Sequence, residues 1–360
     1  MEQIHGGNIE EVITKYNIKQ SEVIDFSSNI NFLGPPQKVL DKIKKELKDI
    51  DRYPEQNSEK LRCLFSEKFG KKKDNYIIGN GAVELIYILV NYLNPTKSLL
   101  LAPTFSEYEK ALNTVNSKVE YHYLEKENNF NLDIEKLKKD LTDDIDLFFL
   151  CNPNNPTGNY ILKNEILDIL EHNSKNDVFT VIDEAFVEFI DQDISALELV
   201  NRYDDLFVLR SLTKLYGLPG LRLGYGVGSQ EIIEAMNCYK DPWNVNILAQ
   251  KAGEVLINQD QYKIKSLKEL DKEKQYLFEK LKQINSLNVY YPNANYLFID
   301  LSSSKFNGTK LYEKLIRDSI LIRKLNNYKG LDDNYIRIAI KDRKSNLKLL
   351  KVINKIFTNN

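Results

Sequence analysis

The residue with the clearest chemical potential in this chain is a lysine in a glycine-rich run. Lys214 lies between two apolar segments, with Ser211 three positions before it and Arg222 eight positions after it. A lysine amine can form a Schiff base with an aldehyde cofactor when its surroundings lower its pKa. A hydroxyl and a guanidinium suit the phosphate ester of such a cofactor. The three residues favour pyridoxal phosphate (PLP) chemistry, although a lysine in this setting is also common in solvated loops.

An acid at the end of an apolar run adds a second part to this site. Asp183 directly follows the apolar residues 178–182. A carboxylate is costly to bury without a partner. The pyridinium nitrogen of PLP is such a partner, and an aspartate that keeps it protonated makes the ring an electron sink. The same aspartate could instead cap a following helix.

Three further motifs suit the remaining parts of a phosphorylated ring. The glycine-rich residues 79–83 follow a short apolar run, and a helix beginning there would direct backbone N–H groups at an anion. Asn155, in the turn 151–158, offers an amide to a ring hydroxyl. Phe105, in 103–108, could stack on a ring. Each motif alone also fits an ordinary turn or core position.

The elements that must position these residues follow from the hydropathy pattern. Short apolar runs alternate with amphipathic segments from about 75 to 230, which predicts an α/β domain around a mostly parallel sheet. Ligands of such sheets bind beyond the carboxyl ends of the strands. The predicted strands are Tyr76–Ile78, Ser98–Leu101, Val119–Tyr123, Asp146–Cys151, Val178–Ile182, Leu206–Leu209 and Gly224–Val227. The predicted helices between them include Ala82–Tyr92, Glu107–Val115 and Lys163–His172.

After Asp241 the pattern indicates a smaller α+β domain. One long polar helix is predicted at about 246–284. Strands then follow at Val289–Tyr291, Tyr296–Asp300, Leu321–Arg323 and Tyr335–Ile340, with helices near 308–318 and 342–357. We therefore expect a large domain at 45–245, and a small domain formed by 1–44 and 246–360.

The bulk composition excludes several classes of protein. The 360 residues include 50 basic and 52 acidic side chains, a net charge of -2, which argues against nucleic-acid and membrane-surface partners. No apolar run approaches the roughly 20 residues of a membrane span, and the first residues lack a signal-peptide pattern. The three cysteines are widely separated, so neither a disulfide framework nor a metal site is expected. A reducing, cytoplasmic location is the simplest expectation.

Taken in order, the motifs resemble the PLP-dependent enzymes of fold type I, the aspartate aminotransferase superfamily. The resemblance covers nearly the whole chain. It implies PLP as the cofactor and a large domain with a mostly parallel central sheet flanked by helices, plus a smaller α+β domain. The motifs that carry it are Gly-Asn-Gly at 79–81, Pro-Thr-Phe at 103–105, Asn-Pro-Asn-Asn-Pro-Thr-Gly at 152–158, Asp-Glu-Ala-Phe at 183–186, Ser-Leu-Thr-Lys at 211–214 and Gly-Leu-Arg-Leu-Gly-Tyr at 220–225.

The resemblance also implies roles for single residues at the cofactor. Lys214 would be the Schiff-base lysine and proton shuttle, Asp183 would contact the pyridine nitrogen, and Asn155 would contact the ring hydroxyl. Phe105 would stack on the ring. Phe186 stands where other members have tyrosine, so one hydrogen bond to the ring hydroxyl is missing. The cofactor phosphate would be held by Gly81, Ala82, Val83, Ser211, Arg222 and, from the second subunit of a homodimer, Tyr53.

The residues expected at the substrate point to a phosphorylated amine. Arg337 resembles the arginine that binds an α-carboxylate bidentately, and Arg323 resembles one that binds a substrate phosphate. His5 can donate to a phosphate, and Asn31 and Asn155 would complete the substrate contacts.

Two branches of the superfamily fit these residues. The segments His5-Gly6-Gly7, 24–34 and 241–246 resemble the threonine-phosphate decarboxylases. We therefore expect decarboxylation of L-threonine O-3-phosphate to (R)-1-amino-2-propanol O-2-phosphate and CO2, in cobalamin biosynthesis. The alternative is a histidinol-phosphate or related aminotransferase that transfers an amino group to 2-oxoglutarate. A PLP-binding regulator is a third interpretation, but no helix-turn-helix pattern is recognised before Asp25.

Overall fold

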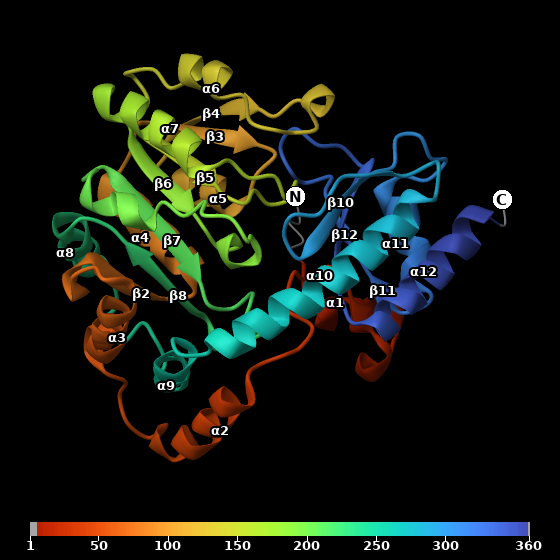
Figure 1. Cartoon of the computed structure of the whole chain (residues 1–360), viewed down its shortest axis with the longest axis horizontal. Helices are drawn as coiled ribbons and strands as arrows, with labels where there is room; N and C mark the ends of the chain where they lie inside the picture. The colour runs from red at the N-terminus through yellow and green to blue at the C-terminus, as the bar shows by residue number, and fades with distance from the viewer. Residues whose placement is uncertain (1–5, 359–360) are drawn as a thin grey trace. The chain divides into compact units, whose positions relative to one another are not determined.

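The computed structural model describes residues 6–358, and the chain divides into two compact units (Figure 1). Unit 1 combines the chain up to Leu33, the short segment Pro156–Gly158 and the chain from Lys265 onward. Unit 2 comprises Gly34–Asn155 and Asn159–Ile264.

The domain limits expected from the sequence differ from this division at three places, one of which is the segment Pro156–Gly158 of unit 1. Residues 34–44 and 246–264 belong to unit 2. The reason is that helix α2 (Gln37–Glu46) packs against helix α9 (Ile247–Leu256) within that unit. The assignment of functional domains to 45–245 and to 1–44 with 246–360 stays a prediction.

Unit 2 is built on a seven-stranded sheet, which confirms the predicted α/β fold (Figure 1). The strand order is β2-β8-β7-β6-β5-β3-β4. Strand β8 runs antiparallel to both of its neighbours, and the other adjacent pairs are parallel. All seven strands lie where the hydropathy pattern predicts them. Their bounds are β2 Tyr76–Asn80, β3 Lys97–Ala102, β4 Lys118–Tyr123, β5 Leu147–Cys151, β6 Phe179–Asp183, β7 Leu206–Ser211 and β8 Leu223–Val227.

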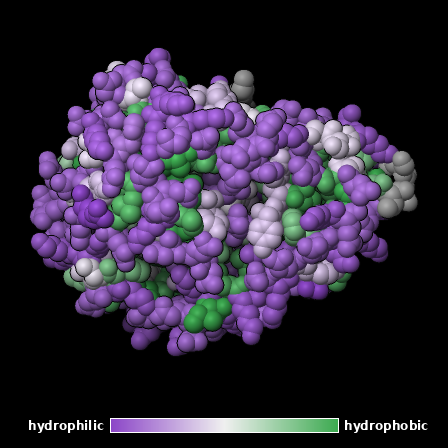
Figure 2. Space-filling model, turned by 45° about the horizontal axis from the view of Figure 1, so that its top comes forward, coloured by the Kyte–Doolittle hydropathy of each residue, from purple (hydrophilic) through white to green (hydrophobic). Residues whose placement is uncertain are grey.

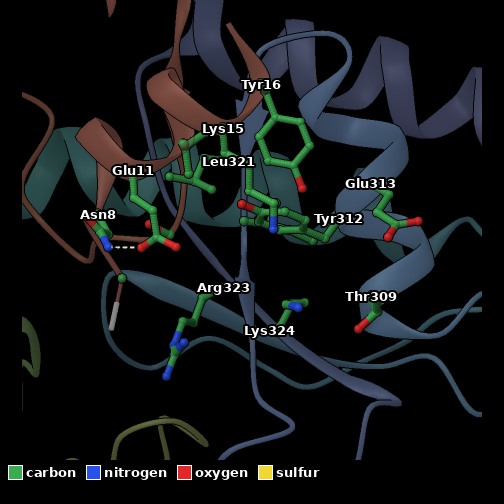
Figure 3. A pocket seen from close by; sticks show the side chains of 14 residues that line it. Asn8, Glu11, Lys15, Tyr16, Thr309, Tyr312, Glu313, Leu321, Arg323 and Lys324 are labelled. Carbon is green, nitrogen blue, oxygen red and sulfur yellow. Dashed lines mark hydrogen bonds between the residues drawn. The ribbon is translucent and has the colours of Figure 1, made fainter. Parts of the chain in front are cut away.

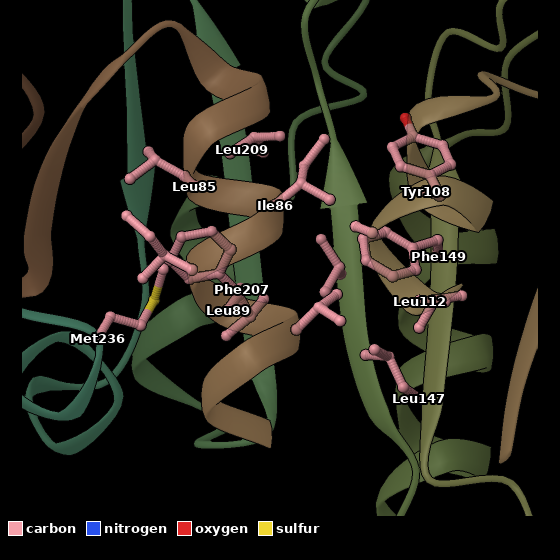
Figure 4. Packing of buried hydrophobic residues seen from close by; sticks show 14 of the residues in the cluster. Leu85, Ile86, Leu89, Tyr108, Leu112, Leu147, Phe149, Phe207, Leu209 and Met236 are labelled. Carbon is pink, nitrogen blue, oxygen red and sulfur yellow. The ribbon is translucent and has the colours of Figure 1, made fainter. Parts of the chain in front are cut away.

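Helices cover both faces of this sheet. On one face, α4, α5 and α8 enclose a buried apolar cluster that includes Leu85, Leu112, Phe149, Phe207 and Met236 (Figure 4). The remaining helices of this unit that have at least seven residues are α2, α3, α6, α7 and α9. The bounds not yet given are α3 Glu59–Phe69, α4 Ala82–Leu93, α5 Glu107–Thr114, α6 Ile134–Asp140, α7 Lys163–Lys175 and α8 Gln230–Cys238.

Contacts on the opposite face of the sheet come from α3 and α7. The ring of Phe65 on α3 lies 4.5 Å from the ring of Tyr225 on β8, measured between centroids. The Nδ2 of Asn173 on α7 donates to the Oγ1 of Thr180 on β6 at 2.9 Å. With both faces covered, the strands other than the edge strand β4 are buried along most of their length, as their continuous apolar runs predict.

Unit 1 contains two small sheets. The four-stranded sheet is antiparallel in the order β12-β13-β10-β9, and β1 pairs in parallel with β11. The strand bounds are β1 Ile24–Asp25, β9 Asn288–Val289, β10 Tyr296–Asp300, β11 Ile320–Leu321, β12 Arg323–Lys324 and β13 Tyr335–Ala339. The helix bounds are α1 Ile9–Tyr16, α11 Gly308–Ile316 and α12 Arg343–Thr358, while α10 (Asp260–Lys282) contributes residues to both units.

Two of the predicted elements are divided in the structure. The predicted long helix at 246–284 is two helices, α9 and α10, because the chain between them forms tight turns, with the Gln259 amide donating to the Leu256 carbonyl at 3.0 Å. The predicted strand at 321–323 is shared between β11 and β12, because its two ends pair with different partner strands, β1 and β13.

The outer surface agrees with the composition. The face shown in Figure 2 is mostly hydrophilic, and its hydrophobic residues are gathered in small groups. Among the described residues, no helix has the length and apolar character that a membrane span requires.

Close packing within the sheet of unit 2 predicts a stability effect. A Cβ at Gly226 of β8 would lie 2.1 Å from Cζ of the fully buried Phe207. We expect Gly226→Ala to lower the free energy of unfolding by about 1–3 kcal/mol, because the ring has no room to move. Urea unfolding followed by circular dichroism measures this change.

The matched control for that substitution is Gly220→Ala. Gly220 is exposed, and an added Cβ there would meet no atom within 4 Å. Equal unfolding midpoints for the two variants would contradict the packing explanation.

Candidate active site

One end of the candidate site is the beginning of α4. Gly81 precedes the helix with a φ of 81°, and a Cβ there would lie 2.5 Å from Nη2 of Arg222. Ala82 and Val83 are the first two helical residues, and the N–H groups of a first helical turn have no acceptor within the helix. Glycine at position 81 therefore leaves a guanidinium beside free backbone donors. This is a cradle for an anion that any side chain at position 81 would fill.

Strand β7 adds hydroxyl groups to this cradle. Ser211, the last residue of β7, is paired with Gly224 of β8, and a Cβ at Gly224 would lie 2.4 Å from the Ala82 nitrogen. The Ser211 Oγ is 2.8 Å from the Oγ1 of Thr213. The sequence assigned five residues of one subunit to the phosphate, and the structure brings them together: Gly81, Ala82, Val83, Ser211 and Arg222. Thr213 is a further candidate that the sequence reasoning missed, although it stands next to the lysine.

Asp183 lies at the carboxyl end of β6, beside Cys151 of β5. Its Oδ2 accepts a hydrogen bond from the Tyr108 hydroxyl at 2.7 Å, and its Oδ1 accepts one from the Ala185 amide at 2.9 Å. Burial raises the pKa of Asp183, while these two hydrogen bonds and the charge of Lys214 lower it. The side chain is a buried acid with donors already in place, and its position fits a contact with a protonated ring nitrogen.

Lys214 follows β7 and is half-buried. Its Nζ lies over the ring of Phe186, 6.0 Å from the ring centroid. The lysine is also close enough to Asp183 to lower the pKa of that carboxyl. The amine of Lys214 and the buried acid therefore share one electrostatic environment, and the face of the Phe186 ring lines it.

Asn155 and Phe105 lie on two loops that are bound to each other. The Thr104 Oγ1 donates to the Asn154 Oδ1 at 2.9 Å, and the Asn154 Nδ2 donates to the Pro103 carbonyl at 2.9 Å. Asn155 is buried and Phe105 is half-buried. Asn154 was not among the predicted site residues, and it fixes the two loops that carry them.

Tyr53 lies apart from this group on the surface of unit 2. Tyr53 is 78% exposed, and its ring is tilted by 31° against the ring of Trp243, with centroids 4.7 Å apart. Its expected contact with the phosphate in a second subunit stays a prediction.

Unit 1 contains the two arginines predicted for the substrate. Arg323 of β12 and Arg337 of β13 are directly opposite each other in the antiparallel sheet, so their side chains leave the same face. Both are buried. The Arg337 Nη2 donates to the Ser27 carbonyl at 2.9 Å. Burial lowers the pKa of Arg323, and the positive charge of Arg337 adds to this effect. Two buried like charges on neighbouring strands make a strong anion-binding position.

A pocket of about 280 Å³ adjoins Arg323 in unit 1 (Figure 3). It is lined mainly by α1, α11 and β11–β12. Arg323 extends away from the pocket tyrosines Tyr16 and Tyr312, whereas the Nζ of Lys324 lies 5.3 Å from the Tyr312 ring centroid (Figure 3). The guanidinium of Arg323 is therefore directed away from the aromatic part of the pocket, and its Nη2 donates to the Asn327 Oδ1 at 2.9 Å.

The remaining two predicted substrate residues are Asn31 and His5. Asn31 is buried in unit 1, where its Oδ1 accepts from the Leu33 amide at 3.0 Å and its Nδ2 donates to the Ser266 Oγ at 2.9 Å. These bonds give Asn31 a role in fixing the chain, and its contact with substrate stays a prediction. His5 lies outside the described residues.

The residues of unit 2 fit PLP. A glycine cradle beside Arg222 suits the phosphate, the buried Asp183 suits the ring nitrogen, and Lys214 suits the aldehyde. Within residues 6–358, no group of three or more His, Cys, Asp and Glu side chains could hold a metal ion.

Comparison with known families decides the identity of the fold. Residues 21–353 match the model of the family described as aminotransferase class I and II. This chain belongs to that family. Aminotransferase class I and II proteins are PLP-dependent enzymes, so PLP is the cofactor of this member too.

The proteins similar to this chain are named for two different activities. It is 36% identical to a "Putative threonine-phosphate decarboxylase" of Caldanaerobacter subterraneus subsp. tengcongensis, over 98% of this chain and 94% of the relative. It is 33% identical to the threonine-phosphate decarboxylase of Salmonella typhimurium, over 98% of this chain and 96% of the relative. Among solved structures, the histidinol-phosphate aminotransferase from Clostridium acetobutylicum is 33% identical, with a TM-score of 0.86 and coverage of 93% of this chain and 99% of that one.

The chemistry assigned to Lys214 predicts a spectroscopic result. We expect Lys214→Ala to replace the Schiff-base absorbance of the bound cofactor with that of free PLP, because the amine that reacts with the aldehyde is missing. The visible absorbance spectrum of the purified, PLP-incubated variant, compared with that of free PLP, measures this.

Lys240→Met is the matched control for Lys214→Ala. Lys240 is a second lysine of unit 2; it is buried, and burial lowers its pKa to about 8. A Schiff-base spectrum in Lys214→Ala, or its loss in Lys240→Met, would contradict the assignment.

Proposed function

We propose that this enzyme decarboxylates L-threonine O-3-phosphate to (R)-1-amino-2-propanol O-2-phosphate and CO2, a reaction of cobalamin biosynthesis. The observation that carries this function is the cross-strand pair of Arg323 and Arg337. Both guanidinium groups are buried, and each can bind a carboxylate or a phosphate through two parallel hydrogen bonds.

The spacing of the pair favours a small substrate with two anionic groups. Opposite residues of antiparallel strands have Cα atoms about 4.5–5.5 Å apart. Threonine phosphate carries its carboxylate and its phosphate ester on neighbouring carbons, so one molecule could occupy both arginines. Histidinol phosphate carries a phosphate but no carboxylate, so it could occupy only one of the two arginines.

The names of the relatives support the same activity. The two relatives named for threonine-phosphate decarboxylation are 36% and 33% identical to this chain. The segments His5-Gly6-Gly7 and 241–246 also resemble that branch. A histidinol-phosphate aminotransferase remains the alternative, and the solved structure at 33% identity supports it.

Each proposed site residue has a distinct task in the reaction. Bound PLP withdraws electrons from the bond that breaks at the substrate Cα. Asp183 keeps the ring nitrogen protonated. Arg337 binds the carboxylate and Arg323 the phosphate, and the two together fix the rotation about Cα so that the bond to the carboxylate is the one that breaks. Lys214 delivers a proton to Cα in place of the departing CO2.

The proposed enzyme acts as a homodimer. Tyr53 supports this arrangement, because a tyrosine that is 78% exposed is available to a second copy of the chain. In that dimer Tyr53 would donate its hydroxyl to the phosphate of the cofactor in the second subunit.

The activity has a direct test. We expect the PLP-loaded enzyme to release one CO2 for each threonine phosphate consumed, measured by trapping 14CO2 from carboxyl-labelled substrate. Amino transfer from histidinol phosphate to 2-oxoglutarate is measured in parallel. No CO2 release together with rapid amino transfer would replace the decarboxylase with the aminotransferase.

Variants of the two arginines should separate phosphate binding from carboxylate binding. We expect Arg323→Gln to lower kcat/KM for threonine phosphate by about 100-fold or more, since one buried charge partner is lost. It should leave the slow turnover of unphosphorylated threonine almost unchanged. Arg337→Gln should lower both values.

The control for the arginine pair is Arg343→Gln. Arg343 is also in unit 1 but lies at the surface, where its Nε is 3.0 Å from the Glu273 Oε1. If Arg323→Gln lowered kcat/KM equally for threonine phosphate and for unphosphorylated threonine, Arg323 would not bind the phosphate.

A further inference from the structure

Tyr108 connects the hydrophobic core of unit 2 to the acid of the cofactor site. It lies on the first turns of α5 and is fully buried. Its ring stacks on the ring of Phe149, with centroids 4.8 Å apart and planes 12° from parallel. Its hydroxyl lies at the edge of the apolar cluster (Figure 4), and it donates to the Asp183 Oδ2 at 2.7 Å. The ring of Tyr108 therefore packs in the apolar core, whereas its hydroxyl contacts a carboxylate.

The donors around Asp183 fix the orientation of its carboxylate. One oxygen accepts from the Ala185 amide at 2.9 Å and the other from Tyr108. The amide belongs to the backbone two residues on, whereas the hydroxyl comes from a different helix. Rotation of the carboxylate would break both bonds. Tyr108 is thus the side chain that holds this carboxylate in one plane.

The surroundings also make Tyr108 a permanent donor. Burial raises the pKa of the Tyr108 hydroxyl well above its usual value, and the negative charge of Asp183 raises it further. The neighbouring Cys151 thiol stays neutral too, since burial and Asp183 raise its pKa, and it donates to the Pro153 carbonyl at 3.3 Å. Of the influences that lower the pKa of Asp183, the hydrogen bond from Tyr108 is the largest.

The segment that contains Tyr108 also contains Phe105, the residue expected to stack on the cofactor ring. Phe105 is three positions before Tyr108, and the two rings meet edge to face, with centroids 5.5 Å apart and planes at 82°. A displacement of Tyr108 would move Phe105 as well. The segment 103–108 thereby links the predicted contact on the ring face to the acid at the ring nitrogen.

We propose that Tyr108 is a positioning residue for the cofactor: its hydroxyl holds the Asp183 carboxylate in the orientation that receives the ring nitrogen of PLP. A buried carboxylate with a fixed donor needs no reorganisation when the cofactor arrives. Tyr108 acts through Asp183 and touches neither substrate nor cofactor. This role concerns the cofactor alone, so it holds for decarboxylation and for amino transfer alike.

Tyr108→Phe separates this role from packing, because it keeps the ring on Phe149 and removes only the hydroxyl. The probes are PLP and 1-deaza-pyridoxal phosphate, in which carbon replaces the ring nitrogen. We expect the substitution to weaken PLP binding to the cofactor-free, full-length enzyme by about 10-fold or more, since a hydrogen bond to a charged group is lost. Binding of the deaza compound should change less than about twofold, because it offers Asp183 no ring nitrogen.

A pH series gives a second measurement on the same variant. Without the donor, the pKa of Asp183 rises, so its ionised form is lost at a higher pH as the solution is acidified. We expect the loss of PLP affinity on acidification to begin at a higher pH in Tyr108→Phe than in the unsubstituted enzyme.

The matched control is Tyr76→Phe. Tyr76 is likewise fully buried in the sheet of unit 2, and its ring packs on Phe65, away from Asp183. It should leave the affinities for both compounds unchanged. Equal losses for PLP and the deaza compound in Tyr108→Phe, or no loss for either, would overturn the assignment.

A second substitution keeps the test decisive if Tyr108→Phe does not fold. Incorporating 3-fluorotyrosine at position 108 retains the hydroxyl and makes it a stronger donor. The ratio of PLP affinity to deaza affinity should then rise above that of the unsubstituted enzyme. An unchanged or lower ratio in a folded protein would count against the role of Tyr108.

Discussion

The burial of a carboxylate at the end of an apolar strand is the constraint on which the cofactor site depends. Asp183 ends a strand that is covered on both faces, where an isolated charge would be costly. The chain offsets this cost with the Ala185 amide, the Tyr108 hydroxyl and the positive charge of Lys214. The protonated ring nitrogen of PLP would complete the set of partners. The acid therefore requires neighbours from three separate parts of the chain.

The topology of the sheet also forms the cradle that suits the cofactor phosphate. Strand β8 runs in the direction opposite to the other six strands of the unit 2 sheet, and it lies between β2 and β7. This placement sets Gly224 and Arg222 against the first residues of α4. Glycines at positions 81 and 224 permit the close approach, because side chains there would meet the guanidinium and the backbone. Backbone donors, a hydroxyl and a guanidinium are thus assembled from three segments.

The residues proposed to decide the reaction belong to a different part of the molecule. Lys214, Asp183 and the phosphate cradle suit PLP chemistry in general, and all of them belong to unit 2. The arginines at 323 and 337 belong to unit 1, where two short antiparallel strands set them opposite each other. Their shared face is the feature that favours a substrate with two neighbouring anions. The candidate cofactor residues and the proposed substrate residues therefore belong to separate units.

The sequence by itself determined the seven strands of unit 2, the cofactor and its local motifs. It could do so because strands covered on both faces are continuous apolar runs, and because the motifs follow those runs directly. Tertiary structure alone decided the contacts between distant segments. Examples are the hydrogen bond between Tyr108 and Asp183, 75 residues apart, and the pairing of Arg323 with Arg337. Such contacts depend on strand register and helix packing, which are cooperative properties of the whole fold and leave no local pattern in the chain.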